Sequence, residues 1–253
     1  MRTLSLQSGS NGNCIYVEAG DVRLLFDAGI SGLQAERRLA DRGRDIRGCH
    51  ALIISHNHSD HCRSAGVFHR KFGLPVYMTG PAYRSVRKYL GAVREVRQYA
   101  AGESLRFGGV TVHTLRTPHD GLETACFIIE HEGRRLGVLT DLGYPFPALA
   151  DALSQLDAAF LESNYDRAML WDGPYPEHLK HRIAGAGGHL SNEEAATLVR
   201  NHANGRLKWL AIAHLSEENN RPELALAAHR ARVGRLLPLH HASRYEAGEW
   251  LEV

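Results

Sequence analysis

The sequence predicts an α/β protein that folds as one layered sandwich domain over residues 1–253. Short apolar or alternating runs typical of strands occur along the chain, and from Ala158 onward they alternate with helical patterns. No Pro/Ser-rich linker, low-complexity segment or repeat divides the chain. Hydrophobic residues make up 43% of the 253 residues and charged residues 23%, so a packed core is available and global disorder is excluded.

The first two thirds of the chain is rich in expected strands. The loop over residues 8–13 is built from Gly, Asn and Ser and separates the first two strands, while Gly20 separates the second from the third. Ala51–Ile54 is continuously apolar, which is typical of a strand buried on both faces. The expected strands are Leu4–Leu6, Ile15–Val17, Val22–Phe26, Ala51–Ile54, one after Phe72, Val110–Leu115, Ala125–Glu130 and Arg135–Leu139, with helices at Leu33–Asp41 and before Tyr99.

The last third alternates between strands and helices. Ser191 can cap a helix, and Glu194 three residues later completes a capping box. Pro222 suits the first position of another helix. The expected elements are strands at Ala158–Leu161 and Leu207–Ala213 and helices at Ser191–Asn204 and Pro222–Arg232.

Composition narrows the function classes. The net charge of +2 does not mark a nucleic-acid binder, whereas 16 histidines indicate metal. No apolar run approaches the ~18 residues of a membrane span, and the first residues lack the apolar stretch of a secretory signal. The four cysteines are far apart without a C-x-x-C pair, so we expect reduced thiols in a cytoplasmic protein.

Four potential metal ligands fall within six residues directly after the Ala51–Ile54 strand. In extended backbone, residues two apart point to the same side, so His56 and His58 can hold one ion. Asp60 and His61 follow the expected turn and can face a second ion. Neutral imidazole and ionised carboxylate are both available at pH 7, as metal ligation requires.

Further candidates follow three other expected strands. His119 comes after Val110–Leu115, Asp141 ends the Arg135–Leu139 strand, and His214 ends the Leu207–Ala213 strand. Sites in layered α/β folds collect at the carboxyl ends of strands. The recurrence of His and Asp at four strand ends therefore predicts a metal centre at one edge of the sandwich.

The ordered pattern H-x-H-x-D-H, then an isolated His, an Asp and a late His, resembles the metallo-β-lactamase-fold hydrolases. The resemblance covers most of the chain and implies a four-layer αββα sandwich. Further segments are similar to the YycJ/WalJ exodeoxyribonuclease group of that superfamily, and the late ones also to RNase Z. They are residues 8–13 (SGSNGN), 139–143 (LTDLG), 161–164 (LESN), 188–192 (GHLSN) and 214–220 (HLSEENN).

The resemblance implies two divalent metal ions, zinc or manganese with iron as a further choice, and a metal-bridging hydroxide as nucleophile. It assigns His56, His58 and His119 to the first ion, and Asp60, His61 and His214 to the second. Asp141 would bridge the ions, and Asp60 would also count as catalytic. His189 would be a non-ligand histidine that protonates the leaving group, oriented by the Glu162 carboxylate.

The chain departs from the family pattern in three places. Ser64 stands where the superfamily often has Gly, and Tyr165 where relatives often have His, so a role of Tyr165 in the site does not follow from the resemblance. The segment from Pro238 to His241 has no counterpart in the pattern.

These features predict a dinuclear phosphodiesterase, foremost a DNA exonuclease that acts on single strands or 5′ ends. Aromatics mixed with cations between Arg167 and Gly188 suit contact with single-stranded DNA, and a surface excursion explains them equally well. A basic helical face at Arg84, Arg87 and Lys88 is an alternative. The candidate substrate contacts are Ser8, Asn13, Trp171, Lys180, Arg182 and Asn219.

Two other functions remain open at this point. The first is a small-molecule metallo-hydrolase, such as a lactonase, a thioesterase or a cyclic-nucleotide phosphodiesterase. The motifs around His189 and His214 favour nucleic acid over thioesters. The second is a non-catalytic metal-binding module, which the hard ligand Asp60 among the histidines disfavours.

Overall fold

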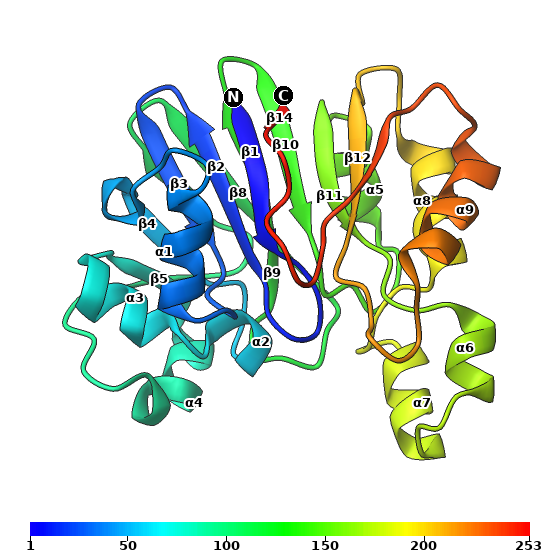
Figure 1. Ribbon diagram of the computed structural model, residues 1–253, viewed down its shortest axis with the longest axis horizontal. Coiled ribbons are helices and arrows are strands. Elements are labelled where there is room, and N and C mark those ends of the chain that lie inside the picture. Colours follow the sequence, from blue (N-terminus) through cyan, green and yellow to red (C-terminus); the bar gives the residue numbers. More distant parts are fainter.

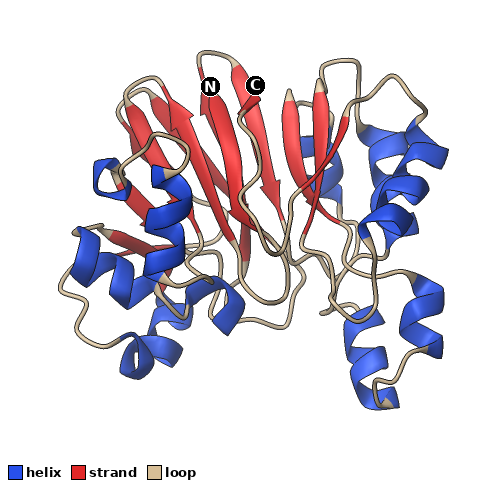
Figure 2. Cartoon of the chain, viewed as in Figure 1, coloured by secondary structure: helices blue, strands red, loops and turns tan.

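The computed structural model describes residues 1–253 as a sandwich of two seven-stranded sheets with helices on both outer faces (Figures 1 and 2). The first sheet has the spatial order β14 (Leu251–Glu252), β1 (Arg2–Gln7), β2 (Cys14–Ala19), β3 (Val22–Phe26), β4 (Ala51–Ile53), β5 (Val76–Thr79) and β6 (Val96–Tyr99). The second has the order β13 (Leu239–His241), β12 (Trp209–Ala213), β11 (Ala158–Glu162), β10 (Arg134–Leu139), β9 (Ala125–His131), β8 (Val110–Arg116) and β7 (Ser104–Phe107).

Helices form the two outer layers. Those of the first sheet are α1 (Gly32–Ala40), α3 (Ala65–Phe72) and α4 (Gly80–Leu90), with a short 3-10 turn η1 (Ile46–Gly48) and α2 (Ser59–Cys62). Those of the second are α5 (Pro147–Leu153), α8 (Asn192–His202) and α9 (Pro222–Val233). Two further helices, α6 (Arg167–Asp172) and α7 (Glu177–Ala184), project beyond the sheet (Figure 1). No helix combines the length and the apolar character needed to cross a membrane.

Three apolar layers hold the four structural layers together. Along β2, Tyr16 faces the α1–α3–α4 layer while Ile15 and Val17 face the other sheet, which is the two-residue alternation of a strand. Phe26 and Phe127 meet between the sheets, with ring centroids 5.1 Å apart. The αββα sandwich expected from the resemblance is confirmed.

The expected strands and helices are present, with small shifts at their ends, and the structure adds elements that the sequence patterns did not predict. β6, β7, β13 and β14 are edge or near-edge strands of two to four residues, too short for a clear alternation. The segment from Arg167 to Gly188, for which the sequence indicated no helix, contains α6 and α7. Asp166 caps α6 by accepting a hydrogen bond from the Met169 N–H.

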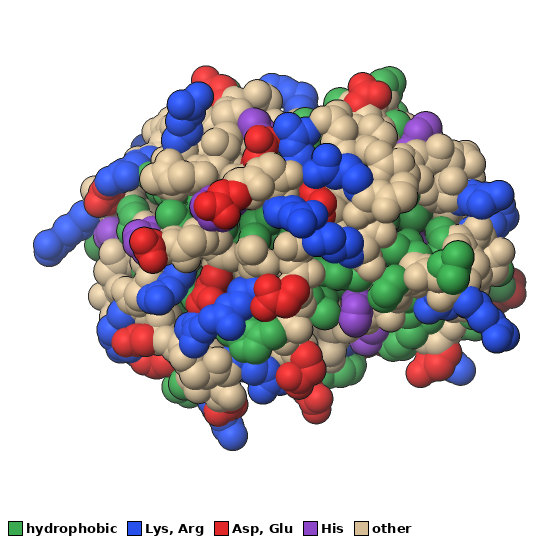
Figure 3. Space-filling model, turned by 90° about the horizontal axis from the view of Figure 1, so that it is seen from above, with side chains coloured by type: hydrophobic (Ala, Val, Ile, Leu, Met, Phe, Trp, Pro, Cys, Tyr) green, Lys and Arg blue, Asp and Glu red, His purple; other side chains and the backbone are tan.

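Strand directions explain where a site can form. The antiparallel and parallel pairings make β1, β3 and β4 point the same way in one sheet, and β8, β10, β11 and β12 in the other. Their carboxyl ends lie at the edge that also carries α2, opposite the two termini (Figure 1). The edge with the termini carries basic and acidic side chains mixed together, without a large patch of one sign (Figure 3).

Candidate metal centre

The seven predicted ligands come together at this edge of the sandwich. Two groups of three match the predicted sites, namely His56 with His58 and His119, and Asp60 with His61 and His214. Asp141 belongs to two further groups that overlap them, one with His56 and His61 and one with Glu162, His189 and His214. Within each group the potential ligand atoms lie within 4.8 Å of one another.

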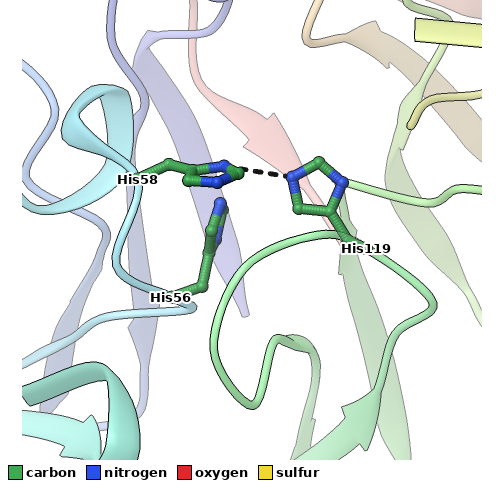
Figure 4. Close-up of side chains that lie close together, drawn as sticks. All are labelled: His56, His58 and His119. Carbon is green, nitrogen blue, oxygen red and sulfur yellow. Dashed lines mark hydrogen bonds between the residues drawn. The ribbon is translucent and has the colours of Figure 1, made fainter. Parts of the chain in front are cut away.

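The first group spans both sheets. His56 and His58 lie on the loop after β4, and His119 lies on the loop after β8. Their three rings converge on one point (Figure 4), and His58 Nδ1 lies 3.2 Å from His119 Nε2. Two ring nitrogens this close can bind the same cation when neither carries a hydrogen.

Asp141 stands between the two groups. Its Oδ1 lies 3.5 Å from His119 Nε2 and 3.4 Å from His214 Nε2. Its Oδ2 lies 3.2 Å from His61 Nε2, which is also 3.4 Å from Asp60 Oδ2. Oδ1 of Asp141 therefore lies beside one member of each group, His119 and His214, and Oδ2 lies beside His61 of the second group.

Partners on the far ring nitrogen orient four of the five histidines. His61 Nδ1 lies 2.7 Å from Asp27 Oδ2, and His56 Nδ1 lies 2.9 Å from Ser55 Oγ. His119 Nδ1 and His214 Nδ1 are held by the backbone oxygen of Gly188 and by Asn13 Oδ1, respectively. These contacts leave Nε2 of all four rings directed at the cluster, as is usual for metal-binding histidines.

The backbone is strained at three of these positions. Asp27, Asp141 and His214 follow the ends of β3, β10 and β12 with φ of 65°, 62° and 54°. Non-glycine residues rarely adopt this left-handed conformation, which costs on the order of 1–3 kcal/mol each. Tight left-handed turns directly after a strand bend these side chains back toward the shared centre.

The cluster fits bound cations in its polar atoms and in its charge states. His56 Nε2 and Asp141 Oδ2 are buried and have no hydrogen-bond partner, although such atoms are normally satisfied. Burial, reinforced by neighbouring histidines, holds the pKa of His56 and His58 below the ordinary value, so both rings are neutral at pH 7. Although burial opposes ionisation, the surrounding histidines lower the pKa of Asp141 and of Asp60.

His189 and Glu162 form a pair beside Asp141. Glu162, fully buried at the end of β11, places Oε2 3.2 Å from His189 Nδ1 and accepts hydrogen bonds from the Asp141 and Leu190 N–H groups at 2.6 and 2.8 Å. Burial opposes a charged imidazole, but Glu162 and then Asp141 outweigh it and raise the pKa of His189. His189 Nδ1 is 4.0 Å from Asp141 Oδ1.

The predicted substrate contacts divide into buried and accessible residues. Ser8 and Asn13 lie beneath the cluster, where the Ser8 hydroxyl accepts from the His214 N–H and Asn13 Nδ2 lies 3.1 Å from His61 Nε2. Asn219 is fully buried, and the Lys180 ammonium is occupied by the Trp171 carbonyl at 2.7 Å. The Asn219 carbonyl accepts the N–H of Asp166 at the start of α6 at 2.8 Å, so both residues hold the α6–α7 region in place.

Two of the predicted substrate contacts are accessible. Arg182 is half exposed, with its Nε 2.7 Å from Asp120 Oδ2 near the His58 ring. Trp171 on α6 is 40% exposed and packs edge-on against His181. These two residues place a cation and an aromatic surface on the α6–α7 projection.

Sequence reasoning missed Asp27, Ser55 and Asp120. Asp27 directly follows β3, as Asp141 follows β10, and that shared position was the available signal. Asp120 follows His119 and lies 3.4 Å from His58 Nε2. Tyr165, by contrast, is buried against Leu170 and Ile183 of the projecting helices, and burial raises its pKa to about 12.

Comparison with known proteins agrees with this geometry. Residues 22–210 match the family described as β-lactamase superfamily domain. The crystal structure of the metallo-β-lactamase-fold protein YhfI from Bacillus subtilis is similar over 100% of this chain and 99% of that one, with a TM-score of 0.77 and 16% identity. The chain belongs to the β-lactamase superfamily and is a metal-dependent hydrolase with the metallo-β-lactamase fold.

Within the superfamily, the chain is similar to two curated relatives. It is 33% identical over 222 residues to exodeoxyribonuclease YycJ of Bacillus anthracis. The aligned region covers 87% of this chain and 84% of the relative. It is 34% identical over 224 residues to exodeoxyribonuclease WalJ of Streptococcus pneumoniae, covering 87% and 83%. The resemblance seen in the sequence motifs is confirmed.

Proposed function

We propose that the protein is a dinuclear phosphodiesterase that degrades DNA as an exonuclease, acting on single strands or on 5′ ends. The observation that carries the proposal is the position of Asp141 between two three-residue ligand groups, with His189 beside it. Curated relatives that are named exodeoxyribonucleases support DNA as the substrate.

The first ion would be held by His56, His58 and His119, the second by Asp60, His61 and His214, and Asp141 would contact both. Mixed imidazole and carboxylate ligands suit zinc or manganese, with iron as a further choice. Two such ions supply Lewis-acid stabilisation of phosphate charge and a water molecule of lowered pKa.

His189 acts as the general acid that protonates the leaving group of the phosphodiester. The raised pKa of His189 favours its protonated form, and Glu162 beside Nδ1 leaves Nε2 as the atom free to donate. A proton donated from Nε2 neutralises the leaving alkoxide of the cleaved strand.

The projecting helices α6 and α7 provide a wall for a nucleic-acid strand. Arg182 lies near the His58–Asp120 side of the cluster, where its cation suits a phosphate next to the reacting one. The exposed ring of Trp171 suits stacking on an unpaired base. Single strands and frayed ends present such bases.

A degradation assay tests this function. End-labelled single- and double-stranded DNA and RNA are incubated with protein loaded separately with Mn²⁺ or Zn²⁺. We expect stepwise shortening of DNA from an end, loss of this activity in Asp141→Asn, and no loss in Asp151→Asn, whose carboxyl is exposed on α5. Hydrolysis of lactones, thioesters or cyclic nucleotides without attack on DNA would instead make the protein a small-molecule hydrolase.

A further inference from the structure

A cavity of about 400 Å³ lies beside the metal centre, between α1 and the C-terminal segment. Arg38, Arg63 and Arg244 line it together with Asn11 and Gln34, and its lining contains no carboxylate. None of these residues belongs to the predicted ligand set. Three cations around an acid-free hollow make a site for an anion.

Two of the arginines are held in place by neutral groups. Arg38 donates to the Leu6 carbonyl and to the side chain of Gln7, and Arg63 donates to the carbonyls of Gly29 and Asn11. Neither guanidinium pairs with a carboxylate. The fold therefore fixes their positive charge in position, and although Glu246 lies near enough to Arg38 to act on its charge, it forms no ion pair with it.

Arg244 provides an independent sign of a missing ligand. It is nine-tenths buried, yet its Nε has no hydrogen-bond partner. The rest of its guanidinium contacts the Leu215 carbonyl at 3.2 Å and Glu217 at 3.3 Å. Buried donors are normally hydrogen-bonded, so Arg244 keeps an unused donor next to the cavity.

The cavity and the metal centre share one loop. Asn13 lies 3.1 Å from both His61 Nε2 and His214 Nδ1, whereas Asn11 lines the cavity and bonds to the Arg244 carbonyl at 3.1 Å. Two residues of chain span at most about 7 Å. A polynucleotide with one phosphate at the metals therefore needs few further nucleotides to reach the cavity.

The first turn of α1 adds to the positive potential. Ser31 caps this nine-residue helix, and its first turn contains no acidic residue. The helix dipole at such an end favours negative charge. Ser31 and Gln34 both line the cavity, so the helix start and the arginines act on the same space.

We propose that this cavity is a second phosphate site, which holds a phosphate of the DNA substrate other than the one being hydrolysed. The inference rests on the function proposed above and deepens it. The ligand is a phosphate group with free oxygens, supplied either by the 5′ terminus or by an internal diester of the strand. Holding it would set the distance between the strand end and the cleaved bond.

Gln34→Glu tests the site without removing a structural contact. The Gln34 side chain accepts the Ser31 N–H in a capping box, and glutamate makes the same contact while adding a negative charge. The matched control is Gln155→Glu, the same change at an exposed position after α5. Steady-state kinetics are measured on single-stranded DNA and on bis-p-nitrophenyl phosphate, and binding of DNA is measured against salt.

We expect Gln34→Glu to raise KM for DNA about tenfold more than KM for the small diester. The slope of the logarithm of the DNA-binding constant against the logarithm of the salt concentration should become shallower by about 0.7, the value for one phosphate contact on a single strand. Gln155→Glu should behave as wild type. If strands with 5′-phosphate and 5′-hydroxyl ends differ in the wild type but not in Gln34→Glu, the bound group is the terminal phosphate. An equal effect on both strands identifies an internal phosphate.

Equal kinetics of Gln34→Glu and Gln155→Glu on DNA would overturn the second phosphate site while leaving the exonuclease intact. An equal rise in KM for the small diester and for DNA would also overturn it, because the change would then act on the metal centre. A wild-type protein that cleaves the small diester but no DNA would overturn the proposed function itself.

Discussion

The carboxylate of Glu162 lies 3.2 Å from Nδ1 of His189. The same carboxylate accepts the backbone N–H groups of Asp141 and Leu190, so one buried side chain fixes both the central acidic residue and the histidine beside it. Three connections to one residue mean that the orientation of His189 and the position of Asp141 are set together.

We expect His189→Ala to lower DNA turnover by roughly 10²–10⁴-fold, the usual contribution of a general acid. Metal content should stay unchanged, as measured by elemental analysis. In Glu162→Gln the pKa of His189 falls because a negative charge is lost, so the alkaline limb of the kcat–pH profile should move to lower pH. Loss of metal from His189→Ala would make this histidine a ligand and contradict its role as acid.

Gently purified protein should contain about two divalent ions per chain, because two ligand groups meet at Asp141. His58→Ala removes one of three imidazoles from the first group and should lower the measured content. The control is His202→Ala, which alters an exposed histidine on α8. A protein that is active, free of metal and insensitive to chelators would refute the metal centre.

Asp27→Asn should weaken metal binding by about 10–100-fold, the usual cost of losing a residue that orients a ligand. Asp27 accepts from Ser55 and lies 2.7 Å from His61 Nδ1, but it is not itself among the grouped ligands. Asp41→Asn at the exposed end of α1 provides the matched control. Competition with a chromophoric chelator measures the affinity, and identical affinities for the two variants would argue against a role for Asp27.

The α6–α7 wall can be tested by DNA binding. If the Trp171 ring stacks on a base, Trp171→Ala should weaken the free energy of DNA binding by about 1–3 kcal/mol. The dependence of binding on salt concentration should stay unchanged. Arg182→Gln should instead reduce the slope by about 0.7, as for one lost phosphate contact on a single strand. Arg206→Gln, which also loses an Asp partner but lies far from the cluster, is the control. Indifference to both changes would favour the α4 face at Arg84, Arg87 and Lys88.

The buried histidine His229 makes the stability of the fold depend on pH. Burial lowers the pKa of this histidine to about 4, against about 6.5 in the unfolded chain. Below pH 6.5 His229 is therefore protonated in the unfolded chain but stays neutral in the folded chain, so the free energy of unfolding falls as the pH drops toward 4. Relative to pH 7.5, the loss at pH 5 should be about 2 kcal/mol.

Urea unfolding of wild type and His229→Gln at both pH values isolates this contribution, because other titrating groups cancel in the difference. Glutamine keeps a polar group near the Ser163 hydroxyl, which lies 3.2 Å from His229 Nε2. His202→Gln should retain the full acid sensitivity of the wild type. An unchanged sensitivity in His229→Gln would show that this residue is not the source.

Much of the fold and the ligand cluster followed from local sequence signals. Ala51–Ile54 predicted a buried strand because its apolar run is continuous, and the ligands after it are dense enough to be read without a structure. Asp27 was missed because its partner His61 is 34 residues away, and a lone Asp after a strand is usually a turn residue. Lys180 looked like a free cation because no local pattern shows that its ammonium meets the Trp171 carbonyl.

Each sheet is built almost entirely from one continuous part of the chain. Residues up to β6 build the first sheet, residues from β7 to β13 build the second, and only β14 returns. His56 and His58 belong to the part up to β6, while His119, Asp141 and His214 belong to the part from β7 onward. Bound ions would therefore cross-link the two parts of the chain at one edge of the sandwich. Two fragments made by cutting the chain between Tyr99 and Ser104 should then associate with higher affinity in the presence of metal than in the presence of a chelator.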